Sequence, residues 1–231
     1  WEINEIIQKC ISEFNFHLMF TTLLNFCSNE LSSFYFDIRK DTIYCDKKDS
    51  IKRRSARTLL DILFNVLIRW LAPSLVFTCE EAWKSRGNKS SIHLEEFFNI
   101  DSNYKNIQIF QKWETVKNIR KVITGALEKK RADKIIGSSL EASIDIYVSS
   151  EISSKLQNID FAEIAITSSA SINESLDFTV GFSIDEVDSV SIDIKKASGR
   201  KCNRCWKIVE EVTNSNEICH RCKDVISSIK D

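Results

Sequence analysis

Residues 50–71 read SIKRRSARTLLDILFNVLIRWL. Apolar residues recur there at helical spacing, at Leu59, Leu60, Leu63, Val66, Leu67 and Trp70. Ser50 is a suitable N-cap, and the opposite side carries Arg53, Arg57, Asp61 and Arg69. Pro73, the only proline, cannot donate a helical hydrogen bond and interrupts the pattern. The stretch predicts a long amphipathic helix with one face in a core.

The same spacing extends on both sides of this helix. It predicts two helices from residue 1 to about 33 with a break near Asn15, another over 74–83, and a long one over about 104–133. Only 5 glycines and 1 proline occur in 231 residues, which argues against an all-β fold. No uncharged apolar run reaches about 18 residues, so we expect no membrane span. Because the chain opens at Trp1 inside a periodic pattern, we expect it to be a piece of a longer protein.

The composition changes at residue 134. Of the next 65 residues 15 are serine, and 11 acidic groups face only 4 basic ones. Alternating patterns predict strands over 143–148, 178–182 and 190–194, with a further strand over 163–167 and a short helix over 151–159. We therefore expect a small α/β module over 134–198 after a helical domain over 1–133. Polyanion binding should avoid the acidic module and use the more basic segments on either side.

The strongest motif lies in the last segment, residues 199–231. Two C-x-x-C pairs, Cys202 with Cys205 and Cys219 with Cys222, are separated by 13 residues. Four thiolates suit one closed tetrahedral Zn²⁺ site of structural type, which would stabilise a segment too short for a core of its own. Another thiophilic metal such as iron, two disulfides, or free thiols remain alternatives. The scattered residues Cys10, Cys27, Cys45 and Cys79 are expected to be inert, and His220 is expected to be a bystander.

Basic and aromatic residues supply candidates for nucleic-acid contacts. Arg53, Arg54 and Arg57 form the densest basic cluster and would suit a phosphate or an unpaired base, although an ordinary solvated helix face is the alternative. Trp206 follows a cysteine ligand and is either a core residue or an exposed stacking platform. No glycine-rich phosphate loop and no nucleophile pattern beside the three histidines is present. The sequence gives no reason to expect chemistry from this chain alone.

Several strings resemble bacterial isoleucyl-tRNA synthetases, in the same order along almost the whole chain. They are FYFDIRKD at 34–41, RRS at 53–55, RWLAP at 69–73, FTCEEAW at 77–83, KIIGSSLEA at 134–142, GRKCNRCW at 199–206 and EICHRC at 217–222. The front strings are partly shared with valyl and leucyl relatives. The cysteine pairs at this end point to the isoleucyl type.

The resemblance implies a mainly α fold: a helical bundle of the class I synthetase anticodon-binding type over 1–133, an α/β junction over 134–198 and a four-cysteine zinc finger over 199–231. It implies a tRNA-recognition fragment of an isoleucine–tRNA ligase that binds the anticodon stem-loop. ATP and isoleucine would be handled by catalytic and editing domains of which no string occurs here, so we expect the fragment to be inactive alone. The implied tRNA contacts are Arg53, Arg54, Arg57, Lys40, Lys201, Arg204 and Trp206, and the implied zinc ligands are the four clustered cysteines.

We expect a cytoplasmic monomer that binds isoleucine tRNA and neither membrane nor DNA. Two other interpretations stay open. Some DNA-repair glycosylases end in a similar four-cysteine finger, but they would place a helix-two-turn-helix where this chain has its acidic, serine-rich module. The finger is alternatively a purely structural cap that touches no nucleic acid.

Overall fold

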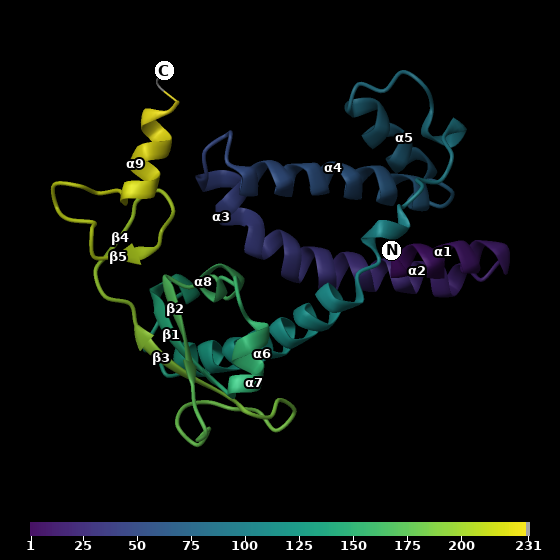
Figure 1. The fold of residues 1–231 in the computed structure, drawn as a ribbon. Helices are drawn as coiled ribbons and strands as arrows, with labels where there is room; N and C mark the ends of the chain where they lie inside the picture. Colours follow the sequence, from purple (N-terminus) through teal and green to yellow (C-terminus); the bar gives the residue numbers. More distant parts are fainter. Residues whose placement is uncertain (230–231) are drawn as a thin grey trace. The chain divides into compact units, whose positions relative to one another are not determined.

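The computed structural model describes residues 1–229, which form two compact units (Figure 1). One unit comprises residues 1–37 and 48–106, and the other comprises residues 38–47 and the chain from 107 onward. Among the described residues, no helix combines the length and the apolar character needed to cross a bilayer.

The first unit is entirely helical. Its elements are α1 (Glu2–Ser12), α2 (Phe16–Asn25), the π-helix η1 (Phe26–Phe36), α4 (Ile51–Leu71), α5 (Val76–Ser85) and two 3₁₀ turns, η2 (Ile92–Leu94) and η3 (Ser102–Tyr104). The break predicted near Asn15 is confirmed, because the Asn15 side chain accepts a hydrogen bond from the backbone N–H of Leu18 at 3.2 Å and starts α2 there. The helix predicted from Ser50 is confirmed as α4, with Ser50 as its N-cap.

The second half of α4 organises the packing of this unit. Val66 and Trp70 join one buried cluster with α1 and α2, and Ile68 and Ala72 join another with α5 and η2. The first half of α4 is less covered, since Leu59 keeps 38% of its surface exposed. The helix therefore has a packed end at Leu71 and an accessible end after Ser50.

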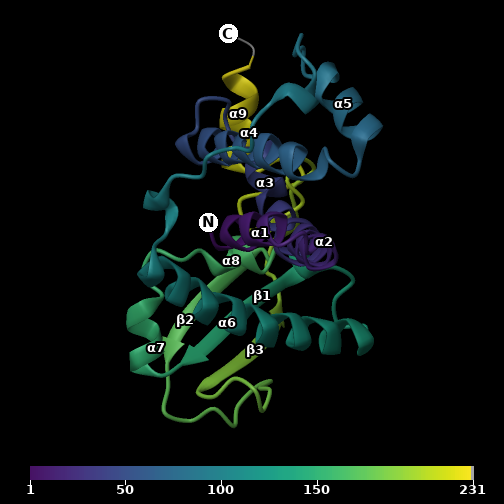
Figure 2. The same ribbon diagram turned by 90° about the vertical axis from the view of Figure 1, so that its right-hand side faces the viewer.

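The second unit combines a small sheet with helices. Its elements are α3 (Asp37–Cys45), α6 (Ile107–Ala132), η4 (Ser139–Glu141), β1 (Ala142–Val148), α7 (Ser150–Lys155), α8 (Phe161–Ile164), β2 (Ser169–Glu174), β3 (Val190–Lys196), β4 (Arg200–Lys201), β5 (Ile208–Val209) and α9 (His220–Ser227). The three longer strands form one sheet in the order β2-β1-β3, with β1 parallel to β2 and antiparallel to β3. Figure 2 shows α6 running along one face of this sheet.

Apolar side chains of α6 and β1 make the core of this sheet unit. The buried residues of α6 are Val116, Ile119, Val122, Ile123, Ala126 and Leu127. From β1 the alternate residues Ala142, Ile144, Ile146 and Val148 are buried. The predicted long helix is α6, which packs on the sheet through contacts with β3, and the predicted strand over 143–148 is β1, the central strand of that sheet.

The other predictions for residues 134–198 were partly right. The strand over 190–194 is confirmed as β3, and the helix over 151–159 is present as α7 but ends earlier, at Lys155. The strand predicted over 163–167 is wrong, because Asp160 accepts a hydrogen bond from the backbone N–H of Glu163 at 3.1 Å and caps α8 instead. The strand predicted over 178–182 is wrong too: only Phe182 forms a bridge, to Ile192, and Asp177 turns the chain by accepting from the backbone N–H of Thr179.

The fold class is confirmed as a mainly helical chain with a small α/β part. The two compact units group the chain differently from the three predicted segments, because α6 packs on β3 although it was placed with the helical domain. The boundaries after residues 133 and 198 stay a prediction.

Replacing Ile146 by Ala should destabilise the sheet unit. Ile146 is fully buried at the centre of β1, so the truncation removes apolar contacts and leaves a cavity. We expect the free energy of unfolding to fall by about 2–5 kcal/mol in urea titrations followed by circular dichroism. Lys196→Ala, at the exposed end of β3, should change it by less than about 0.5 kcal/mol. Equal, small losses in both variants would contradict the placement of this core.

Candidate metal centre and nucleic-acid interface

Four cysteine thiols converge in the segment after residue 199. The Sγ atoms of Cys202, Cys205, Cys219 and Cys222 all lie within 4.8 Å of one another, and all four residues are buried. The Sγ atoms of Cys205 and Cys219 are 3.7 Å apart. Sulfurs held about 2.3 Å from one ion at tetrahedral corners lie about 3.8 Å apart, whereas a disulfide bond is about 2.0 Å long. The donor set and its spacing fit one tetrahedral metal ion, and the cysteines are free thiols.

Backbone geometry brings the two pairs together. The first pair sits in the turn between β4 and β5, which the Trp206 backbone N–H closes by donating to the Cys202 carbonyl at 2.9 Å. The second pair sits at the start of α9, where Cys219 is the N-cap and Cys222 lies in the first turn. Each ligand pair is therefore fixed by a local backbone element, and an ion would join the two elements.

The thiols have different tendencies to ionise. Burial opposes ionisation of Cys202, but the backbone N–H groups of Cys205, Cys219 and Arg204 lower its pKa to about 6. One of these donors, the N–H of Cys219, lies 3.3 Å from the Cys202 Sγ. Burial raises the pKa of Cys219 well above its ordinary value. The backbone alone thus favours the thiolate of Cys202, whereas ionisation of all four clustered cysteines requires a bound cation.

Trp206 is an exposed platform beside the metal-site candidate. The sequence left a core role and a stacking role open, and the structure leaves 60% of its surface exposed. Its backbone has φ +66°, a left-handed conformation that is uncommon for a bulky residue. The Lys201 Nζ lies 5.4 Å from the centre of the indole ring, and Lys201 is exposed as well. The pair offers a flat aromatic face and a positive charge to solvent.

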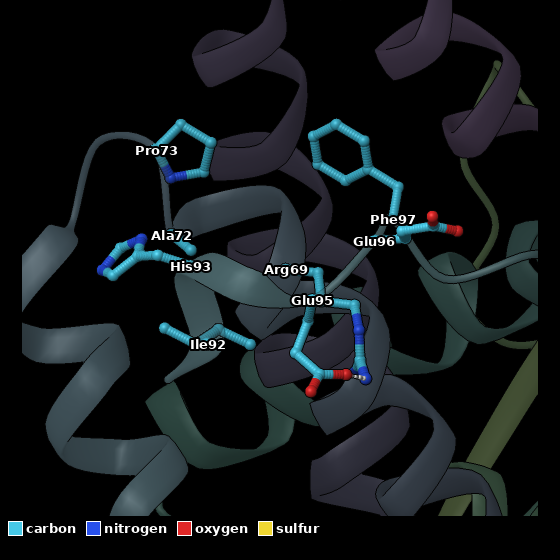
Figure 3. A pocket seen from close by; sticks show the side chains of 8 residues that line it. All are labelled: Arg69, Ala72, Pro73, Ile92, His93, Glu95, Glu96 and Phe97. Atoms are coloured by element: carbon cyan, nitrogen blue, oxygen red, sulfur yellow. Dashed lines mark hydrogen bonds and ion pairs between the residues drawn. The ribbon is translucent and has the colours of Figure 1, made fainter. Parts of the chain in front are cut away.

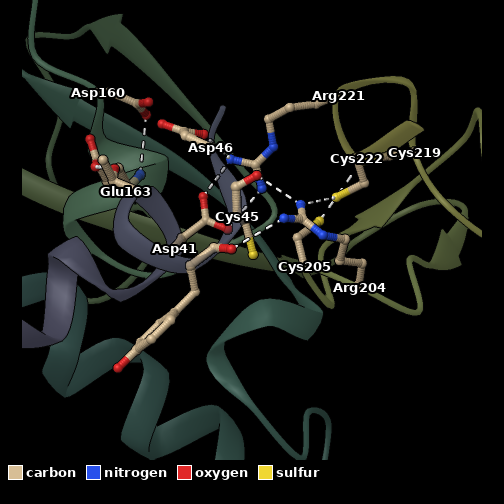
Figure 4. A network of polar contacts seen from close by, with 12 residues as sticks. Asp41, Cys45, Asp46, Asp160, Glu163, Arg204, Cys205, Cys219, Arg221 and Cys222 are labelled. Atoms are coloured by element: carbon tan, nitrogen blue, oxygen red, sulfur yellow. Dashed lines mark hydrogen bonds and ion pairs between the residues drawn. The ribbon is translucent and has the colours of Figure 1, made fainter. Parts of the chain in front are cut away.

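The other predicted contacts on this unit differ in accessibility. Lys40 is exposed on α3, and its neighbour Arg39 forms an ion pair with Glu163 at 2.9 Å. Arg204 is half-buried, and its guanidinium donates to the backbone carbonyls of Tyr44 and Cys45 (Figure 4). The donors of Arg204 therefore point into the protein, while Lys40 remains accessible.

The predicted arginine cluster lies at the start of α4. Arg54 and Arg57 are exposed, and Arg53 is half-buried. Arg54 also borders a hollow of about 480 Å³, which is lined by Ile51, Arg54, Ser55, Thr58, Leu59, Ile62 and Tyr104. The sequence analysis gave no role to Tyr104 or to the hydroxyls of Ser55 and Thr58; Tyr104 left no local signal because it is distant along the chain from residues 51–62.

A second hollow, of about 330 Å³, lies at the packed end of α4 (Figure 3). There Arg69 pairs with Glu95 at 2.9 Å, and its guanidinium carbon lies 4.9 Å from the ring centre of Trp83. Glu96 adds a further carboxylate to the lining. The cation is already neutralised, so this hollow has little attraction for a phosphate.

Two carboxylates near the cysteines were missed from the sequence. Asp41 and Asp46 accept hydrogen bonds from Arg221, which stands between Cys219 and Cys222. The one sequence signal was the repeated pattern Cys-x-Arg-Cys, which places Arg204 and Arg221 at equivalent positions of the two pairs.

Comparisons with known proteins bear on the whole arrangement. A family model described as the anticodon-binding domain of tRNA ligase matches residues 2–146. The chain is 40% identical over 213 residues to the isoleucine–tRNA ligase of Bartonella henselae, covering 91% of the chain and 22% of the relative. It is 42% identical over 213 residues to that of Agrobacterium fabrum, covering 91% and 22%. It is 40% identical over 231 residues to that of Gluconobacter oxydans, covering 98% and 23%. The chain thus spans less than a quarter of the length of these relatives.

Cys202→Ser should abolish stoichiometric metal binding. The change removes the thiol that the backbone best prepares as a thiolate, and it should loosen the segment after residue 199 while α4 and its neighbours keep their stability. Metal content by mass spectrometry and helical content by circular dichroism report the two effects. Cys27→Ser, a half-buried thiol of η1, is the matched control and should keep its metal. A stoichiometric ion in the Cys202 variant would contradict this ligand set.

Proposed function

We propose that this chain, which belongs to the family of anticodon-binding domains of tRNA ligases, binds the anticodon stem-loop of isoleucine tRNA. The observation that carries the proposal is the family match over residues 2–146, together with about 40% identity to isoleucine–tRNA ligases over nine-tenths of the chain. ATP-dependent attachment of isoleucine is proposed for a longer protein of which this chain is the tRNA-recognition region.

The start of α4 supports a contact with phosphates. Its first turn carries Lys52, Arg53 and Arg54 and no acidic residue. A cation near the positive end of a helix dipole is unfavourable by about 0.3–1 kcal/mol, so an anion bound beside the exposed Arg54 would offset a local repulsion. An anion bound across this turn would meet exposed guanidinium groups as well as the N-terminus of the helix.

The hollow beside Arg54 supports a contact with an unpaired base. Its lining combines apolar side chains with the hydroxyls of Ser55 and Thr58 and with Tyr104, which is 65% exposed. Bases of a single-stranded loop are splayed out, stacked on aromatic rings and read on their edges, while basic groups hold the phosphates. A base in this hollow would place its phosphate near Arg54.

The four-cysteine centre is proposed to hold one structural Zn²⁺, coordinated by Cys202, Cys205, Cys219 and Cys222. When bound, the ion would supply folding energy and no catalytic function, because four protein ligands leave no open position. Lys201 and Trp206 would then extend the RNA-binding surface, with the indole stacking on a base. Eight free thiols fit a reducing compartment, and we propose a cytoplasmic location.

A filter-binding experiment tests the proposed partner. The chain is titrated with isoleucine tRNA, with the same tRNA carrying a swapped anticodon, and with abasic duplex DNA, each at low salt because phosphate contacts are salt-sensitive. Tightest binding to the unaltered tRNA supports the proposal. Preference for the abasic duplex would support the glycosylase alternative, and no binding to any of the three would support a purely structural role.

Arg54→Ala and Arg57→Ala should each weaken binding of isoleucine tRNA by roughly 1–3 kcal/mol. Both side chains are exposed on α4, so the loss should come from the interface and leave helical content unchanged. Lys89→Ala, an exposed lysine of the same unit, removes an equal charge away from the start of α4 and is the control. If both arginine variants bind with the dissociation constant of the unaltered chain, the cluster is an ordinary solvated helix face and makes no RNA contact.

A further inference from the structure

The two cysteine pairs carry an arginine at the same position. Arg204 precedes the second cysteine of the first pair, and Arg221 precedes the second cysteine of the other. Figure 4 shows both guanidinium groups directed away from their own backbone toward α3, where Asp41 and Cys45 lie. Two separate segments of the chain therefore reach one helical turn.

Arg204 binds the end of α3. Its Nη1 donates to the carbonyl of Cys45 at 2.7 Å, and its Nη2 donates to the carbonyl of Tyr44 at 3.1 Å. The last carbonyls of a helix have no partner within the helix and carry its negative dipole end, so a cation there is favourable. The same Nη1 lies 3.5 Å from the Sγ of Cys222. One guanidinium thus connects a candidate metal ligand to the end of α3.

Arg221 binds the same turn through carboxylates. Its Nη1 and Nη2 lie 2.6 and 2.7 Å from the two oxygens of Asp41, and Nη1 lies 3.2 Å from an oxygen of Asp46. A forked, two-bond contact of this kind fixes direction as well as distance. Burial would raise the pKa of Asp41, but Arg221 holds it below its ordinary value, so the carboxylate stays charged.

We propose that Arg204 and Arg221 are positioning residues that fasten the four-cysteine segment to the C-terminal turn of α3, so that metal binding and the ordering of this turn are coupled. An ion shared by both cysteine pairs fixes the distance between the two arginines, which then reach α3 together. Without the ion each pair must be ordered separately, at a larger loss of conformational entropy. Coupling of this kind is reciprocal: the fastened turn tightens metal binding, and metal binding protects the turn.

This role differs from the RNA contact that the sequence predicts for Arg204. A guanidinium that already donates to two carbonyls would have to break these bonds to meet a phosphate. The inference rests on the proposed metal site but not on RNA binding, so its test needs no tRNA.

The test uses the full chain loaded with zinc. Metal content of the unaltered chain is measured first, and zinc affinity is then measured by competition with a chromogenic chelator. Amide hydrogen exchange over residues 42–46 is followed with and without zinc. We expect Arg204→Gln and Arg221→Gln to weaken zinc binding about 10- to 100-fold. Lys223→Gln, an exposed charge of α9, is the matched control and should change neither quantity.

Hydrogen exchange distinguishes coupling from a general loss of stability. Coupling predicts a zinc-dependent change at residues 42–46 alone, whereas a general loss of stability would speed exchange throughout the unit. Removal of zinc from the unaltered chain should speed exchange over residues 42–46 and leave the buried residues of β1 protected. In the Arg204→Gln, Arg221→Gln double variant, exchange over 42–46 should no longer respond to zinc. Exchange at this turn that ignores zinc in the unaltered chain, or full zinc affinity in both single variants, would overturn the inference. Absence of zinc from the unaltered chain would instead overturn the proposed metal site, on which the inference rests.

Discussion

The segment after residue 199 has almost no apolar core, so its stability depends on other interactions. Among its described residues, the buried side chains are the four clustered cysteines with Val212 and Val225. Packed thiols alone give a segment of this length too little apolar burial to offset its conformational entropy. Two substitutes are available: an ion bound by the sulfurs, and contact with a neighbouring helix. The structure provides the geometry for the first and shows the second, since Cys45 of α3 packs into the same cluster.

Four arginines among the described residues fall into two electrostatic classes. Arg204 and Arg221 lie at the negative end of α3 and against carboxylates, where a positive charge lowers the free energy of the fold. Arg54 and Arg57 lie in the first two turns of α4, near the positive end of a helix with no acidic residue in its first turn. The first class has its anion within the protein. The second class is exposed to solvent, where the phosphates of a bound RNA would supply its anion, as proposed for α4.

Local patterns determined what could be predicted from the sequence. The helix from Ser50, the break at Asn15 and the cysteine quartet each depend on residues close together in sequence, and each is present in the structure. Strands were harder, because Asp160 and Asp177 bind nearby backbone N–H groups and turn segments whose apolar alternation resembled strands. The strand β2, with the sequence SASINE, was missed because half of it is serine or glutamate and it pairs on one side only, with β1. Long-range partners left no local signal at all: Arg204 and Arg221 meet residues about 160 and 180 positions earlier in the chain, so no spacing rule could pair them with α3.

The turn that holds Cys202 and Cys205 has one side bound to α3 and another side exposed to solvent. Arg204 ties the turn to α3 on the inside, and the adjoining residues Lys201 and Trp206 are exposed on the outside. A tethered backbone has already lost its conformational freedom, so an aromatic ring carried on it binds a base at a smaller entropic loss than the same ring on a free loop. The left-handed backbone at Trp206 is a local strain of about 1–3 kcal/mol, and such strain persists only where the surroundings fix it. At Trp206 the backbone N–H donates to the Cys202 carbonyl at 2.9 Å, which holds the residue in this turn while its indole is exposed. Anchoring by Arg204 and the proposed stacking by Trp206 would then both depend on this one turn, so a disordered turn would also weaken the proposed stacking.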